Sequence, residues 1–215
     1  MLRMRFLHLV VLMLMFADAS SQSSYFNTCF EEYWQGSFTR SVFTQNGEFI
    51  SCGILNDSSS YYGEIAFVKI DHDGNFTIIN YIDEIGKRHD PGYGGSFKAY
   101  NNGFILGGSA RIPVGGSYEA IFWRFNNAYD TVLTKTYLNP IGGKINFTNT
   151  NITQDGGIIF CGEYETQDDS LNFLLLKTDS VGYEKWRRIY SFGKSNTPYS
   201  VKQANDGGYI ISGRS

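Results

Sequence analysis

Short runs of apolar residues alternate with polar turns along most of the chain, and the runs recur at a nearly fixed interval. Four segments pass from Asn or Asp through a glycine turn into an apolar run and end on glycine: Asn46–Gly53, Asn101–Gly108, Asp155–Gly162 and Asp206–Gly213. Their closing glycines are 55, 54 and 51 residues apart. Glycine tolerates positive φ, and a short apolar run after it is typical of a covered strand. Each segment therefore predicts a turn followed by an inner strand.

Three further series of predicted strands share this period. The second series consists of apolar runs that lead to a cation: Ala66–Asp71, Ile121–Asn126 and Phe173–Asp179. The third is rich in aromatic residues: Phe76–Tyr81, Val132–Tyr137 and Tyr183–Tyr190. A fourth strand leads into the next glycine turn: Ser96–Tyr100, Lys144–Ile152 and Tyr199–Ala204. Four short strands in each ~50 residues are typical of a propeller blade, in the range of kelch-like repeats.

We therefore predict an all-β fold, a propeller-like array of four-stranded antiparallel blades over residues 37–215. The expected units are 37–86, 94–141, 142–193 and a truncated 194–215, which amounts to about 3.5 blades. A closed propeller has about 4 to 8 blades, so we expect the chain to be a fragment of a longer protein. The alternative is an open, curved stack of blades whose free edges are covered by self-association.

The N-terminus has the pattern of a secretory signal peptide. Two arginines precede an apolar run of 11 residues, Phe6–Phe16, and Ala17 and Ala19 then form the A-x-A cleavage pattern. The run is shorter than the roughly 20 residues of a membrane-spanning helix. We expect cleavage after Ala19, an N-terminal segment over 20–36 and a secreted or cell-surface protein that does not span a membrane. The alternative is a short uncleaved anchor.

Composition supports the β prediction and excludes several functional classes. The 215 residues include 24 glycines but only 4 prolines, and 16% are aromatic, which favours strands and tight turns. A net charge of −3 argues against a nucleic-acid-binding surface. Three cysteines are too few for a disulfide scaffold. No phosphate-binding loop and no zinc spacing is present, so we predict no cofactor.

The last two units carry a recognisable motif. It consists of the turn and strand Asp206–Gly213 together with Lys177, Thr178, Asp179, Gly182 and Trp186. This motif resembles a β-propeller-type repeat common in bacterial secreted proteins. The resemblance implies export, in many cases by the type IX secretion route with a C-terminal sorting domain, and no such domain is visible in these residues. It implies no catalytic residue, because the signature positions of the repeat are turns and core.

One turn of the first unit has the composition of a calcium site. Asp71, Asp73 and Asn75 offer alternating oxygen ligands around a glycine, which suits that cation. The equivalent turns, 126–129 and 179–182, do not keep these ligands, and a hairpin turn explains all three. We therefore predict no metal site and retain calcium only as the weaker alternative.

The remaining polar motifs have plain structural explanations. Cys52 and Cys161 share one repeat position and are expected to be buried and unreactive, with a Cys29–Cys52 disulfide as an alternative. The His89-Asp90 pair is expected in a Gly/Pro-rich loop between the first two units, and no partner nucleophile is identifiable. The carboxylate pairs Asp168-Asp169 and Glu31-Glu32 are expected to be solvated rather than catalytic.

Aromatic residues in or beside the variable loops are the candidate binding residues, because such side chains stack on sugars and anchor protein partners. They are Tyr61, Tyr62, Tyr93, Tyr118 and Trp123, with Phe122 beside the last. We predict a non-catalytic binding or display module whose ligand is a protein or a glycan. The alternatives are a carbohydrate-active propeller enzyme and a structural spacer within a surface protein.

Overall fold

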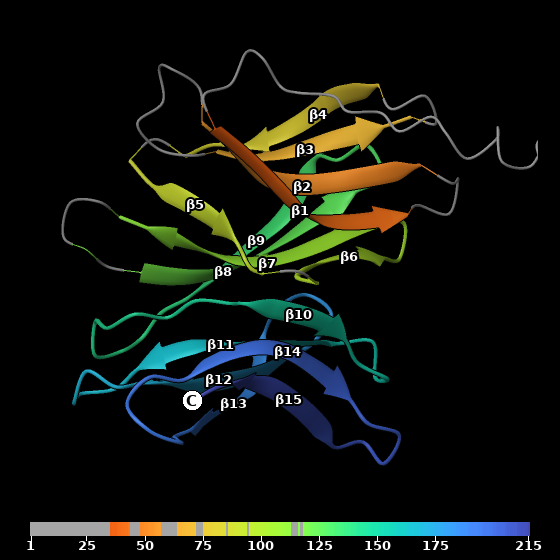
Figure 1. The fold of residues 1–215 in the computed structure, drawn as a ribbon. Coiled ribbons are helices and arrows are strands. Elements are labelled where there is room, and N and C mark those ends of the chain that lie inside the picture. Colours follow the sequence, from red (N-terminus) through yellow and green to blue (C-terminus); the bar gives the residue numbers. More distant parts are fainter. Residues whose placement is uncertain are drawn as a thin grey trace, which may run out of the picture.

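The structure is a computed structural model. It describes residues 35–43, 48–56, 64–71, 75–84, 86–93, 95–112, 116 and 118–215. These residues form fifteen β-strands and no helix (Figure 1). The all-β prediction is therefore confirmed for the described part of the chain. The expected signal peptide, with its cleavage site at Ala19, lies outside the described residues.

The strands form four antiparallel sheets that follow one another along the chain. Sheet A contains β1 (Gln35–Phe43), β2 (Phe49–Asn56), β3 (Glu64–Ile70) and β4 (Phe76–Ile82). Sheet B contains β5 (Arg88–Pro91), β6 (Phe97–Tyr100), β7 (Gly103–Arg111), β8 (Tyr118–Asn126) and β9 (Thr131–Tyr137). Sheet C contains β10 (Asn149–Ile152), β11 (Ile158–Glu165), β12 (Leu171–Thr178) and β13 (Glu184–Tyr190). Sheet D contains β14 (Thr197–Gln203) and β15 (Tyr209–Arg214).

Sheets A and C have four strands in sequence order, as the sequence pattern predicts. Sheet B differs, because β5 and β6 both pair with the same edge of β7. Residues 88–91 were expected to be a loop between two units, and they form a strand instead, because the end of β7 offers them an edge to pair with. Within the described residues, no helix has the length and apolar character needed to cross a membrane.

The sheets stack face to face in chain order (Figure 1). Neighbouring residues of a strand point to opposite sides, so each inner strand contributes to two cores. In sheet C, Phe160 and Leu174 pack towards sheet B, where they join Phe122. Cys161 and Leu175 belong to a second cluster, shared with sheet D. The opposite face of sheet B packs on sheet A. This double burial explains why the inner strands are continuous apolar runs rather than alternating ones.

In sheets B, C and D the closing glycine allows a preceding segment of the chain to approach closely. A Cβ atom built on Gly162 would lie 1.8 Å from the carbonyl oxygen of Asn146. On Gly108 it would lie 2.4 Å from the carbonyl of Asp90, and on Gly213 2.5 Å from that of Thr197. At these three closing glycines the neighbouring backbone therefore lies too close to leave room for a side chain.

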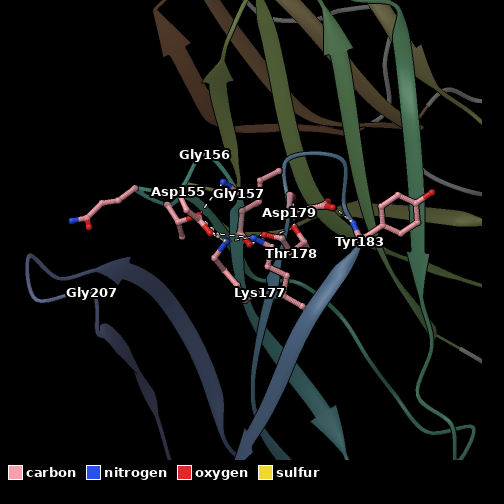
Figure 2. Close-up of polar contacts among 12 residues, drawn as sticks. Asp155, Gly156, Gly157, Lys177, Thr178, Asp179, Tyr183 and Gly207 are labelled. Atoms are coloured by element: carbon pink, nitrogen blue, oxygen red, sulfur yellow. Dashed lines mark hydrogen bonds and ion pairs between the residues drawn. The ribbon is translucent and has the colours of Figure 1, made fainter.

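The repeated Asp and Lys positions form a compact polar cluster at the turn between β10 and β11 (Figure 2). The Lys177 ammonium is buried, and it donates to both carboxylate oxygens of Asp155 at 2.9 and 3.1 Å and to the carbonyl of Thr178 at 2.8 Å. Asp155 also accepts from Thr153 and from the backbone N–H of Gly157. These signature residues therefore hold a turn against its neighbouring strand.

Candidate binding cleft

Two adjoining hollows lie where sheet B meets the segment that leads into sheet C. The first has a volume of about 120 Å³ and is lined by Arg88, Asp90, Ser109, Arg111 and Tyr118. The second, of about 40 Å³, is also lined by Asp90 and Ser109, and it extends to Tyr93. Because the two hollows share these residues, they form one cleft with Tyr118 and Tyr93 at its two ends. We call this the β5–β7 cleft.

Strand pairing places the polar side chains of the β5–β7 cleft in rows. Arg88 of β5 lies opposite Arg111 of β7, and Arg111 lies opposite Tyr118 of β8. Two residues further along β5, and therefore on the same face, Asp90 lies opposite Ser109. Adjacent strands are about 4.8 Å apart, so two arginines, a carboxyl, a hydroxyl and an aromatic ring share one small surface.

Lys144 adds a third cation beside the cleft. The Arg111 guanidinium lies 5.5 Å from the centre of the Tyr118 ring, and the Lys144 ammonium lies 5.7 Å from it. The Lys144 ammonium also donates to Oε2 of the buried Glu163 at 2.6 Å. Both cations lie within the range of cation–π attraction to this ring. The Tyr118 end of the cleft is therefore aromatic and flanked by cationic side chains, of which Lys144 is paired with Glu163.

Asp90 supplies the negative charge of the β5–β7 cleft. The residue is exposed at the surface, yet loss of water around its carboxyl raises its pKa, and Arg40 and Arg88 oppose that rise. The Arg40 guanidinium is itself buried and donates to the carbonyl of Gly92. The lining of the cleft therefore combines the guanidinium groups of Arg88 and Arg111 with the carboxylate of Asp90.

His89 and Asp90 do not form a catalytic pair, because they point to opposite faces of β5. The His89 side chain is 2% exposed and packs edge-on against Trp123, with ring centroids 5.8 Å apart. Burial lowers the pKa of this imidazole. The histidine is therefore part of the core between sheets A and B.

The structure divides the predicted loop aromatics into three groups. Tyr93 and Tyr118 line the cleft, and Tyr93 is 51% exposed. Trp123 lies in the middle of β8 and is 2% exposed, so its placement in or beside a loop is wrong. The same correction applies to Phe122, which is fully buried. Tyr61 and Tyr62 lie outside the described residues.

The turn proposed for calcium resembles two other turns of the chain. The Asp71 carboxylate accepts a hydrogen bond from the N–H of Asn75, four residues on. Asn126 and Asp179 accept in the same way from the residue four positions ahead. Asp73 lies outside the described residues. Within the described part of the chain, no group of three or more His, Cys, Asp or Glu side chains is placed to hold a metal ion.

The Asp168-Asp169 pair belongs to the turn between β11 and β12. One carboxylate oxygen of Asp168 accepts from Thr166 at 2.7 Å and the other from Ser170 at 2.9 Å. These hydroxyls hold the pKa of Asp168 below its ordinary value, which is opposite to the requirement for a general acid. Asp169 has a φ of 58°. The second predicted pair, Glu31-Glu32, lies outside the described residues.

Cys52 and Cys161 are buried free thiols in two different cores. Burial raises the pKa of Cys52, and it raises that of Cys161 to about 12. A low thiolate population makes a cysteine unreactive, which agrees with the structural role expected for both. Cys29, the alternative partner of Cys52, lies outside the described residues.

Four cleft residues were not singled out by the sequence: Arg88, Ser109, Arg111 and Lys144. Their only local signal is that Ser109 follows the closing glycine Gly108 directly and Arg111 lies two residues further on.

The class of protein that the geometry defines is an all-β protein of stacked antiparallel sheets. No protein-family model matches the chain, and a search of curated proteins gives no match.

Proposed function

We propose that this chain is a non-catalytic binding module, exported to the cell surface or beyond, whose sheets are blades of a β-propeller. The propeller arrangement is supported by four sheets in series, each packed on the next, and by the sequence period of about 53 residues. Export, including the type IX route, is supported by the N-terminal sequence and by the resemblance of the repeat motif. The ligand is a protein or a glycan.

The observation that carries the binding function is the composition of the β5–β7 cleft. Arg88 and Arg111 donate, Asp90 accepts, and Tyr118 offers an aromatic surface within one hollow. Such a combination suits a hydroxyl-rich or carboxylate-bearing ligand, which needs oriented polar contacts beside a ring face. The described carboxylate pair, Asp168-Asp169, is by contrast used to fold its own turn.

A panel of neutral and acidic glycans, together with a protein pull-down, tests this function. We expect retention of a ligand that Arg111→Ala weakens about tenfold, because a charge-assisted hydrogen bond contributes ~1.5 kcal/mol or more. Lys202→Ala is the control, since it removes the same charge from sheet D. Equal weakening by both variants would argue against the cleft.

Two other outcomes would favour the alternatives. Hydrolysis of a polysaccharide by the wild type, lost in Asp168→Asn and Asp169→Asn, would indicate a carbohydrate-active enzyme. Absence of any ligand from both assays would indicate a structural spacer.

A further inference from the structure

Two arginine side chains face each other in the β5–β7 cleft. Arg88 lies directly opposite Arg111 in the antiparallel pair of β5 and β7, and both side chains line the larger hollow. Like charges directly opposite each other in a sheet repel and lower its stability. Among the described residues, no carboxylate forms an ion pair with either guanidinium group. An anionic group placed between them would therefore remove this repulsion.

The other charges around the cleft do not cancel those of the two facing arginines. Asp90 lies two residues from Arg88 on the same face of β5, but the cation that interacts most strongly with it is the buried Arg40. The Lys144 ammonium is paired with the carboxylate of the buried Glu163 at 2.6 Å. Four cations therefore stand against two carboxylates. The net positive charge of the cleft belongs to the facing arginines.

A carboxylate group suits this pair of arginines better than a phosphate group does. Guanidinium groups hold a planar carboxylate by two parallel hydrogen bonds. A phosphate monoester carries a charge of about −1.5 to −2 at pH 7, and the neighbouring Asp90 carboxylate repels the additional negative charge. The position between Arg88 and Arg111 therefore favours a singly charged carboxylate.

The remaining lining of the cleft suits the ring and the hydroxyls of a sugar. Asp90 and Ser109 lie opposite each other in the next row, where they offer an acceptor carboxylate and a hydroxyl. Tyr118 lies opposite Arg111 on β8, and its ring is a flat surface on which the apolar face of a sugar stacks. These groups match a sugar unit that carries one carboxylate beside several hydroxyls, which is a uronic acid.

We propose that the β5–β7 cleft binds uronic acid units of an acidic polysaccharide. The sugar carboxylate lies between Arg88 and Arg111, a ring hydroxyl donates to Asp90, and the apolar face of the ring stacks on Tyr118. This assignment rests on the binding function proposed above and specifies the class of its ligand. A sulfated sugar lacks the planar carboxylate and an acidic peptide lacks the ring hydroxyls, so these are the two rival ligands.

Isothermal titration calorimetry with the full chain and matched ligands tests the proposal. The probes are oligosaccharides of galacturonic, glucuronic, guluronic and mannuronic acid, each beside its methyl ester, which keeps the hydroxyls and removes the charge. We expect at least one acid to bind about tenfold or more tightly than its ester, because hydrogen bonds to a charged group are the stronger ones. Equal binding of acid and ester, or no binding of any of the four acids, would overturn the proposal.

Substitutions in the protein locate the carboxylate. Arg111→Ala should weaken binding of the acid about tenfold and leave binding of the ester unchanged. Arg111→Lys keeps the charge but not the planar fork, so it should still bind the acid about threefold or more weakly than wild type does. Arg188→Ala is the matched control, because Arg188 is an exposed arginine of β13, and it should change neither affinity. Equal losses in Arg111→Ala and Arg188→Ala would contradict the site.

The fold of Arg111→Ala is checked by its thermal unfolding midpoint without ligand. This midpoint should not fall below that of wild type, because the substitution removes the repulsion between two facing cations. A loss of acid binding at an unchanged or higher midpoint therefore reports the site itself.

The rival ligands separate failure of this assignment from failure of the binding function. A sulfated galactan oligosaccharide or a polyglutamate peptide that binds as tightly as the uronic acid, with the same loss in Arg111→Ala, would overturn the uronic acid assignment and leave the cleft as a binding site. Retention of ligands that Arg111→Ala does not weaken would overturn the role of the cleft as well.

Discussion

The phenol of Tyr137 in sheet B donates a hydrogen bond of 2.7 Å to the carbonyl of Gly182 in sheet C. Gly182 has a φ of 80° and lies in the turn that Asp179 begins. A similar contact joins the preceding pair of sheets, where the amide of Asn80 donates to the carbonyl of Tyr129. In both cases the outer strand of one sheet bonds to the positive-φ residue of a turn in the next. Successive sheets are therefore joined by a polar contact as well as by their apolar cores.

Replacing Tyr137 by Phe should destabilise the protein by about 1 kcal/mol, because the change removes one hydrogen bond and leaves the ring packed. Urea unfolding followed by tryptophan fluorescence measures the difference. Tyr183→Phe is the matched control, since this tyrosine is 63% exposed, and it should have almost no effect. Equal losses in the two variants would contradict the role assigned to the contact with Gly182.

Alkaline pH should lower the stability of the fold, in part because of Tyr137. Burial, followed by the charges of Glu184 and Asp179, raises the pKa of Tyr137 above its ordinary value. Above about pH 10 an exposed tyrosine of the unfolded chain ionises, while Tyr137 in the fold remains protonated. The unfolded state then binds fewer protons than the folded state, so stability falls as the pH rises. We expect a smaller loss in Tyr137→Phe than in wild type between pH 9 and pH 11.

Acid should remove the contribution that the Asp155 carboxylate makes to the free energy of unfolding. The hydroxyl of Thr153 and the ammonium of Lys177 hold the pKa of this carboxyl well below its usual range. This contribution is present above about pH 4, the ordinary carboxyl range, and is lost as the pH falls further. Asp155 is half-exposed, so Asp155→Asn should cost about 1 kcal/mol or less at pH 7. The difference between variant and wild type should shrink towards pH 2 in urea unfolding.

Substituting Gly162 by Ala should destabilise the junction of β10 and β11. The new methyl group would lie 1.8 Å from the carbonyl oxygen of Asn146, and relieving such a contact costs ~1–3 kcal/mol. Gly142→Asn is a suitable control, because this glycine has a φ of 81° and open space around it, and Asn tolerates that conformation. Thermal unfolding of both variants measures the difference. A midpoint for Gly162→Ala equal to that of wild type would show that the strand can move away.

The buried thiols should resist chemical modification in the folded protein. Cys52 and Cys161 are fully buried and their pKa values are raised, so the thiolate that reacts is scarce. Quantified labelling with a thiol reagent should modify neither cysteine at pH 8 in buffer and both in 6 M guanidinium. Rapid labelling of Cys161 in buffer would indicate that sheets C and D separate readily.

Local patterns were enough to predict the strands that follow a glycine turn or consist of an apolar run. The segments Asp155–Gly162 and Phe173–Asp179 became β11 and β12 almost as expected. Turn chemistry and strand periodicity act between residues close in sequence, so both can be read without a fold. Strand β5 was missed because Arg88–Pro91 has no such pattern and becomes a strand only by pairing with the end of β7.

Tyr129 shows how a tertiary contact can override a local preference. It stands in its turn where Gly182 stands in the next sheet, and its φ is 68°, a conformation unfavourable for a large residue. Its ring stacks on Phe104, and its hydroxyl donates to Glu48, the residue before β2. These contacts offset the local strain, and they join residues far apart in sequence.

Local sequence patterns were sufficient to predict the β character of the described residues, their turns and the burial of both cysteines, because hydrophobic alternation and glycine geometry are local properties. Which polar side chains meet depends instead on how the strands pair and pack. Arg88, Arg111 and Tyr118 come together because three strands pair in one register. Trp123 entered the core because both faces of sheet B are covered. Ile210 is exposed because it points to the face of sheet D away from sheet C, and no strand among the described residues packs on that face.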